Sequence, residues 1–200
     1  MNRILSLQTS LFDSNSASRS LSIEFIEQLR QKYPHTTVTE RDLAKQPIAH
    51  LTADSFSGFG LPEDQRSESQ QQAAKLSDEL IAELQASDVI VLGLPLYNFG
   101  IPSTLKSWID HIARAGVTFR YTENGPQGLL NGKKLYVIAT RGGQYAGTPA
   151  DTQTDYIRNF YSFLGITDIE FVYAEGLAMG EIRDQSLSQA SEMLHHKAAA

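Results

Sequence analysis

The feature that most constrains the fold is the run DVIVLGLP at residues 88–95, which has no polar side chain between Val89 and Leu94. A strand with one face in water alternates apolar and polar residues, whereas a strand covered on both faces is apolar throughout. The run therefore predicts the central strand of a parallel sheet with helices on both faces.

Other short apolar runs alternate along the chain with stretches of helical period. We expect further strands near residues 4–7, 37–41, 133–140 and 169–173, and helices near 17–33, 76–84, 102–115, 155–164 and from 183 onward. Five βα units in 200 residues predict one α/β domain, residues 1–200. The expected architecture is a doubly wound five-stranded parallel sheet in the flavodoxin-like order, with helices on both faces, rather than a six-stranded Rossmann sheet.

Two segments interrupt the alternation. Residues 46–72 combine Pro and Gly with many Ser and Gln, and we expect them to form a long excursion. Residues 117–134 contain two Asn-Gly pairs and predict a turn-rich extension. Gly116 just before it is expected to cap the preceding helix.

Composition excludes several classes of protein. The net charge of −6 argues against a general nucleic-acid binder, which has a basic surface. Because there is no cysteine, iron–sulfur clusters, disulfides and thiol chemistry are excluded, and any redox role needs a bound cofactor. No histidine has a partner at ligand spacing, so no metal site is predicted. The N-terminal apolar run is too short for a signal peptide or a membrane span, and we expect a cytoplasmic protein without membrane contact.

In open α/β sheets, ligands bind beyond the carboxyl ends of the strands, where the strand order reverses. The loops that follow residues 4–7, 88–95 and 133–140 should therefore converge. The first of these loops carries Ser10, and then Ser16, Ala17 and Ser18 at the start of a helix, where free N–H groups and the helix dipole favour an anion.

Neither GxxxxGK[ST] nor GxGxxG is present, so a terminal monophosphate fits this loop better than a triphosphate or a pyrophosphate. Helix capping by Ser16 or Ser18 is an alternative explanation of the hydroxyls. Arg19 either assists phosphate binding or lies in solvent.

The second loop, PLYNFGIP, offers main-chain amides, the Asn98 amide and the rings of Tyr97 and Phe99 as a wall for a planar heterocycle, unless the two rings belong to the core. In the third loop, TRGGQ, Gly142 and Gly143 allow a close approach of the backbone, and their N–H groups can stabilise negative charge on a ligand. A simple tight turn is the alternative for the two glycines.

Several motifs together resemble the bacterial FMN-dependent NADH-azoreductases, also described as NADH:quinone oxidoreductases. They are TS at 9–10 with SxS at 16–18, PLYNFGIPSTLK at 95–106, ARAGVTFRYTENGP at 113–126, TRGG at 140–143, FLGITD at 163–168 and AEG at 174–176. The resemblance extends over nearly the whole chain, and the stretch at 113–126 is its most specific part.

The resemblance implies a flavodoxin-like homodimer with one FMN per subunit. It implies that the FMN phosphate is held by Ser10, Ser16, Ala17 and Ser18, that the isoalloxazine ring is lined by Leu96, Tyr97, Asn98 and Phe99, and that its pyrimidine side contacts Thr140, Arg141, Gly142 and Gly143. Relatives often have methionine, serine and histidine at the positions of Leu96, Thr140 and Gln144. The resemblance also places Gln144 on the substrate side. It places Tyr121 and Phe163 near the partner subunit's flavin or, alternatively, at a packing surface.

The predicted function is ping-pong hydride transfer from NADH, or from NADPH, to FMN and then reduction of quinones or azo compounds. FMN carries the chemistry, so no side chain is predicted to be catalytic. Three alternatives remain: a flavodoxin-type electron carrier, a non-enzymatic binding module, and an NADPH-dependent FMN or quinone reductase of a neighbouring branch.

Overall fold

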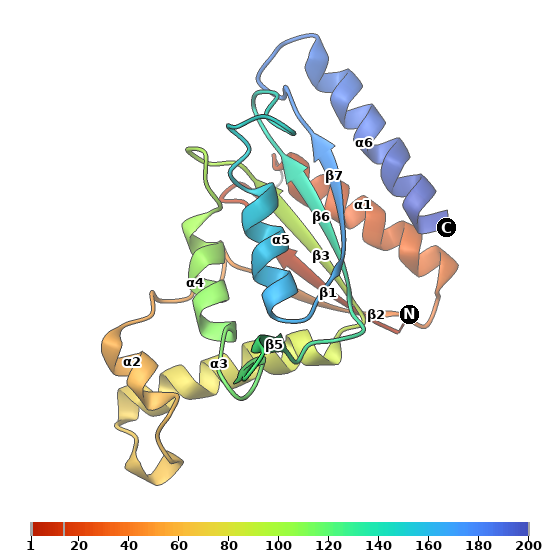
Figure 1. Cartoon of the computed structure of the whole chain (residues 1–200). Helices are drawn as coiled ribbons and strands as arrows, with labels where there is room; N and C mark the ends of the chain where they lie inside the picture. Colours follow the sequence, from red (N-terminus) through yellow and green to blue (C-terminus); the bar gives the residue numbers. More distant parts are fainter. Residues whose placement is uncertain (1, 14, 200) are drawn as a thin grey trace.

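Five parallel strands form the central sheet of the computed structural model, which describes residues 2–13 and 15–199 (Figure 1). The strands are β1 (Arg3–Gln8), β2 (Thr37–Asp42), β3 (Val89–Pro95), β6 (Lys134–Thr140) and β7 (Asp168–Ala174). Their order across the sheet is β2-β1-β3-β6-β7. This is the flavodoxin-like order, and it confirms the predicted fold class.

The run at 88–95 forms the centre of the sheet, because β3 pairs with β1 on one side and with β6 on the other. Every residue of β3 is buried. The edge strand β2 has the polar sequence TVTERD and is mostly exposed, as expected for a strand with only one neighbour. Burial therefore follows the position of each strand in the sheet.

Helices cover both faces of the sheet. Helices α1 (Ala17–Lys32) and α6 (Ile182–Ala199) lie side by side on one face, and the other face carries α3 (Glu68–Ala86), α4 (Ser103–Ile112) and α5 (Thr154–Phe163). Each face has its own hydrophobic cluster: Phe25 and Leu194 belong to the first, and Trp108 and Leu80 to the second. This double cover explains why β3 tolerates no polar side chain.

The irregular excursion predicted at residues 46–72 is shorter in the structure, because part of the segment is helical. It contains α2 (Ala53–Gly58) and the 3-10 helix η1 (Glu63–Gln65), and α3 begins at Glu68. Ser67 and Gln70 form a capping box at the start of α3, a sequence signal that predicts a helix start at this place. Phe59 packs against the rings of Phe56 and His111, whereas the Phe56 side chain is exposed.

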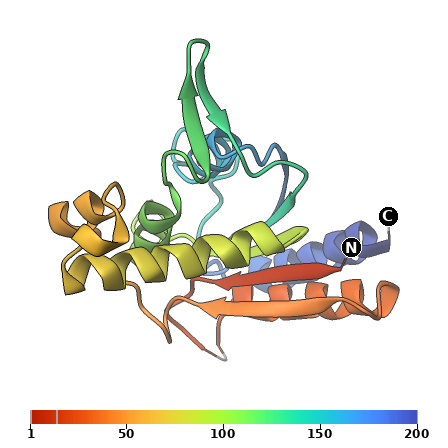
Figure 2. The ribbon, with the colours of Figure 1, turned by 90° about the horizontal axis from the view of Figure 1, so that it is seen from below.

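The extension at 117–134 contains an antiparallel hairpin of β4 (Phe119–Thr122) and β5 (Gly125–Gly128), which projects from the layers in Figure 2. The prediction for Gly116 was wrong. Helix α4 ends at Ile112 with Ala113 as its C-cap, and Gly116 lies in the following turn, where its φ of 80° favours glycine.

No helix in residues 2–13 and 15–199 is long and apolar enough to cross a membrane. The cytoplasmic location stays a prediction.

The hairpin is held against the turn between α5 and β7 by a close contact of glycines. A Cβ atom at Gly128 would lie 2.1 Å from the main-chain nitrogen of Gly165. We therefore expect Gly128→Ala to lower the free energy of unfolding by at least about 2 kcal/mol, as overpacking against backbone does. Gly60→Ala is the control, because its Cβ would come no closer than 3.9 Å to any neighbour. Urea denaturation of the two variants measures the difference, and equal stabilities would refute the contact.

Candidate functional site

The three loops predicted to converge do meet at the carboxyl edge of the sheet. The hydroxyls of Ser10 and Tyr97 lie 3.3 Å apart, which joins the first loop to the second. The Leu96 N–H donates to the Thr140 carbonyl at 2.9 Å, which joins the second loop to the third. A cavity of about 470 Å³ lies between the second and third loops, within the range of small-molecule sites. It is lined by Leu96, Asn98, Phe99, Gly142, Gly143, Tyr145 and Ala178.

Serine hydroxyls are concentrated at the start of α1. Ser10, Ser16 and Ser18 are all buried, with at most 5% of the residue exposed. Ser16 is the N-cap of α1: its hydroxyl accepts from the Arg19 N–H at 3.3 Å and lies 3.2 Å from the Ser18 hydroxyl. Capping is therefore present, and it is compatible with anion binding, because the other N–H groups of a first turn have no partner within the helix.

Arg19 lies neither in solvent nor free in the loop. Its buried guanidinium bonds to the Asp42 carboxylate, with Glu40 at 3.5 Å and Asp13 at 3.7 Å. Burial by itself raises the pKa of Asp42, but the hydrogen bond from Arg19 and two from main-chain N–H groups outweigh it and hold this pKa below its usual value. The charge of Arg19 is thus compensated inside the protein.

The second loop is a tight, strained turn. Tyr97 and Gly100 exchange two main-chain hydrogen bonds of 3.2 and 2.9 Å, and the Gln153 side chain donates to the Gly100 carbonyl at 2.9 Å. Asn98 and Phe99 have φ values of 49° and 58°, a conformation that persists only where the surroundings enforce it. Since the turn leaves Phe99 56% exposed and Tyr97 only half-buried, neither ring belongs to the core.

The third loop presents free N–H groups. The carbonyls of Gly142 and Gly143 accept from the N–H groups of Ala178 and Gly176 at 3.0 and 2.9 Å. Within the described part of the chain, the N–H groups of both glycines have no acceptor. Neither glycine has a positive φ, so a left-handed backbone conformation does not explain them. A Cβ at Gly143 would lie 2.7 Å from the Tyr145 ring, so a side chain there would displace that ring.

The Arg141 side chain is turned away from the cavity into a buried ion-pair network. Its guanidinium bonds to Asp151 at 2.7 Å and to Glu175 at 3.2 Å, and it lies 5.0 Å from the centre of the Tyr173 ring. Glu175 also accepts from the N–H of Tyr145 at 2.8 Å. On the side away from the cavity, the network therefore fixes the conformation of the third loop, which we call the glycine loop.

Sequence reasoning overlooked Asp151 and Glu175. Only the motif AEG, noted for its resemblance, pointed to Glu175, and no local pattern singled out Asp151. Burial by itself raises the pKa of Asp151, but hydrogen bonds from Arg141 and Thr154 hold this pKa below its usual value.

The residues predicted on the substrate side lie apart from this cavity. Gln144 lines a neighbouring polar cavity of about 390 Å³ together with Glu175 and Ser186. Tyr121, on the hairpin, is 75% exposed, and Phe163 packs against Phe119 with the ring centres 4.4 Å apart. The histidines and acidic residues of the described ranges form no group of three that could hold a metal ion.

Comparison with known proteins gives the family. The profile of the flavodoxin-like fold matches residues 2–198. A protein of Cellvibrio japonicus named FMN-dependent NADH:quinone oxidoreductase is 49% identical over 200 residues, covering 100% of both chains. A protein of the same name from Alcanivorax borkumensis is 53% identical over 193 residues, which are 96% of this chain and 98% of its own. The chain belongs to this oxidoreductase family.

Solved structures of the family have the same fold. The crystal structure of an FMN-dependent NADH-azoreductase from Bacillus anthracis, in complex with FMN, superimposes with a TM-score of 0.89 at 26% identity, over 100% of this chain and 98% of that one. The azoreductase AzrA superimposes with a TM-score of 0.90 at 27% identity. The family resemblance of the motifs is confirmed.

The buried network behind the glycine loop makes stability dependent on pH. Because the pKa of Asp151 is lower in the folded protein than its unfolded value of about 3.9, its contribution is complete above that value and is lost as pH falls through the folded-state pKa. We expect Asp151→Asn to lower the free energy of unfolding at pH 7 by about 3 kcal/mol, as loss of a buried ion-pair partner does.

The difference in the free energy of unfolding between wild type and Asp151→Asn should become smaller as the pH is lowered from about 5 toward 3. Urea denaturation across this range measures it. Asp155→Asn, at an exposed position in the first turn of α5, is the control and should change stability by less than about 1 kcal/mol. A difference that is independent of pH would show that the Asp151 charge does not stabilise the fold.

Proposed function

We propose that this protein is an FMN-dependent NADH:quinone oxidoreductase that also cleaves azo compounds. The observation that carries the proposal is a pair of N–H groups, at Gly142 and Gly143, that have no acceptor among the described residues. They lie beside a cavity walled by the exposed Phe99 ring. Tyr97, in the turn that walls this cavity, contacts Ser10, in the loop that leads to the serine-rich start of α1. A planar group with a hydrogen-bonding edge and a phosphate at the end of a short chain fits this arrangement.

FMN is the cofactor that fits these residues. The phosphate has buried hydroxyls and a helix start at Ser10, Ser16, Ala17 and Ser18. Leu96, Asn98, Phe99, Gly142 and Gly143 line the cavity for the ring. Tyr97, in the same turn, and Thr140, at the end of β6, are proposed to complete the wall and the pyrimidine side. For Arg141, whose N–H and carbonyl bond to Ala174 and Leu177, we propose a supporting role through the network behind the loop.

Bound FMN supplies two-electron chemistry, with a hydride taken from NAD(P)H and two electrons passed to the acceptor that replaces the nicotinamide in a ping-pong cycle. The protein orients the reactants and places the N–H donors of Gly142 and Gly143 where negative charge develops. No side chain acts as a nucleophile, and solvent supplies the protons. NADH is the proposed donor and NADPH the alternative.

We further infer a homodimer. Phe56 and Tyr121 are 63% and 75% exposed, and with Phe59 and Phe119 they surround a mainly apolar cavity of about 390 Å³. Exposed aromatic clusters of this kind indicate interfaces. In the dimer, Tyr121 and Phe163 would lie near the partner subunit's flavin, and Gln144 on the substrate side.

An anaerobic visible spectrum of the protein with FMN tests the function. We expect NADH to bleach the bound flavin and benzoquinone to restore its colour. Repeating the first step with NADPH decides the donor. If FMN binds but neither nucleotide bleaches it, the protein is an electron carrier. If FMN does not bind, the flavin assignment is refuted.

The double variant Ser16→Ala/Ser18→Ala tests the phosphate site. Losing two hydrogen bonds to a charged group costs about 1 kcal/mol or more for each, so the Kd for FMN should rise at least about 30-fold. The control is Ser67→Ala, which removes the cap of α3 far from the loops and should leave the Kd unchanged. Fluorescence titration measures both. Equal Kd values for the double variant and wild type would restrict the serines to capping.

Tyr121→Ala tests the dimer. An interface aromatic is worth about 2 kcal/mol or more, so the dimer dissociation constant should rise at least about 30-fold in sedimentation velocity experiments. A wild-type protein that sediments as a monomer at micromolar concentration would contradict the homodimer.

A further inference from the structure

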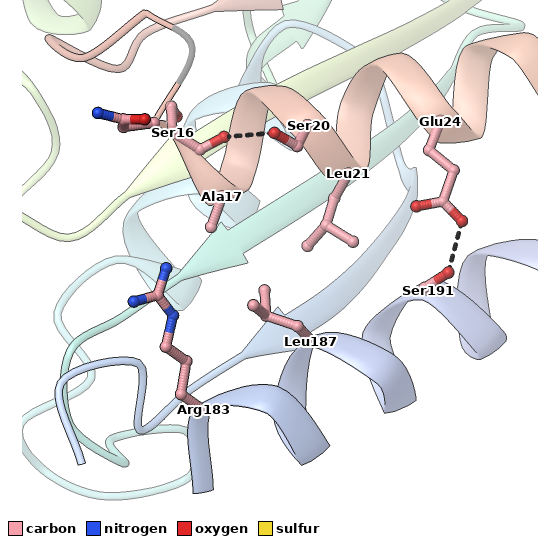
Figure 3. Close-up of a pocket in the computed structure, with 9 residues that line it drawn as sticks. Ser16, Ala17, Ser20, Leu21, Glu24, Arg183, Leu187 and Ser191 are labelled. Carbon is pink, nitrogen blue, oxygen red and sulfur yellow. Dashed lines mark hydrogen bonds between the residues drawn. The ribbon is translucent and has the colours of Figure 1, made fainter. Parts of the chain in front are cut away.

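A further cavity, of about 780 Å³, lies between the start of α1 and the start of α6 (Figure 3). Ser16 and Ala17 line it from α1, and Arg183 and Leu187 line it from α6. It therefore adjoins the proposed phosphate site from the side of α6, a helix that sequence reasoning did not connect with the site.

The two charged residues of this cavity differ in their partners. Glu24, at its far end, accepts hydrogen bonds from Ser191 at 2.5 Å and from Gln28 at 3.3 Å, and lies 3.2 Å from the His195 ring. The guanidinium of Arg183 has no hydrogen bond or ion pair with any residue of 2–13 and 15–199. It extends from the first turn of α6 toward Ser16 and Ala17 in Figure 3.

The Arg183 side chain is exposed, and its surroundings favour an anion. The amino end of a helix carries about half a positive charge. Arg183 lies at the amino end of α6 and points to the amino end of α1, so it adds a cation to two positive helix ends. An anion between them would interact favourably with the arginine and with both helix ends.

The loop with the serines and the start of α1, residues 9–20, contain one arginine or lysine, and its charge is compensated. Arg19, the nearest in sequence, is bonded to Asp42 and has Glu40 and Asp13 around it. Hydroxyls and N–H groups alone would then face a phosphate that carries up to two negative charges. Arg183 is placed to supply the missing positive charge.

We propose that Arg183 is the cationic ligand of the FMN phosphate and closes the phosphate site from α6. This inference rests on the proposed function, because it concerns the same cofactor. Arg183 acts on the phosphate alone and not on the isoalloxazine ring, because it lines the cavity beside Ser16 and Ala17 and not the cavity proposed for the ring. Riboflavin, which has the ring and lacks the phosphate, therefore separates the two interactions.

The experiment is fluorescence titration of wild type, Arg183→Gln and Arg183→Lys with FMN and with riboflavin. We expect Arg183→Gln to raise the Kd for FMN about tenfold or more, as loss of a charge-assisted hydrogen bond does, and to leave the Kd for riboflavin unchanged. Arg183→Lys should recover most of the FMN affinity, since it keeps the charge. The dependence of the FMN Kd on salt should also be weaker in Arg183→Gln.

The control is Arg30→Gln, which makes the same change in net charge at an exposed position in the last turn of α1. It should leave both Kd values unchanged, and a thermal melt checks that each variant is folded. Equal FMN affinity in wild type and Arg183→Gln, or an equal loss for FMN and riboflavin, would overturn the proposal for Arg183 while the flavin site stands. A wild type that binds neither flavin would overturn the proposed function and this inference together.

Discussion

The site depends on the parallel register of β1, β3 and β6. Gln8 is the register partner of Gly93, and Pro95 is the partner of Thr140, so three strands end at one edge of the sheet. Parallel strands deliver their carboxyl ends to the same side, and the reversal of strand order beside β1 and β3 separates the loops there. Every contact between the loops of the candidate site follows from that arrangement.

A second constraint acts on the loops themselves. Their backbone must stay at the surface with N–H groups exposed, yet keep one conformation. Arg141, Asp151 and Glu175 hold the glycine loop from behind, and Gln153 holds the strained turn at Phe99. The side chains that stabilise the loops thus differ from the groups that face the cavity. Such separation allows a site to be rigid and still open.

The charges around the start of α1 follow the same principle. Arg19 is paired with Asp42 inside the protein, whereas Arg183 comes from a helix more than 160 residues further along the chain and has no partner among the described residues. Which arginine is available to an anion depends on where the carboxylates lie. Distance along the sequence is therefore a poor guide to this electrostatic site.

The sequence by itself determined the fold class, because a chain with an apolar run at 88–95 and four further strand–helix alternations has few ways to cover both faces of a sheet. It also determined the three loops, since strand ends can be located from periodicity and turn residues. The start of α3 can be predicted from its capping box. The end of α4 was predicted wrongly, because Ala113 and not Gly116 is the C-cap. Only the tertiary structure decided that Arg141 is buried in an ion-pair network, that Asp151 and Glu175 support the loop, and that Arg183 points to α1. These roles come from pairings between residues far apart in sequence, and local periodicity carries no information about which distant charges will meet.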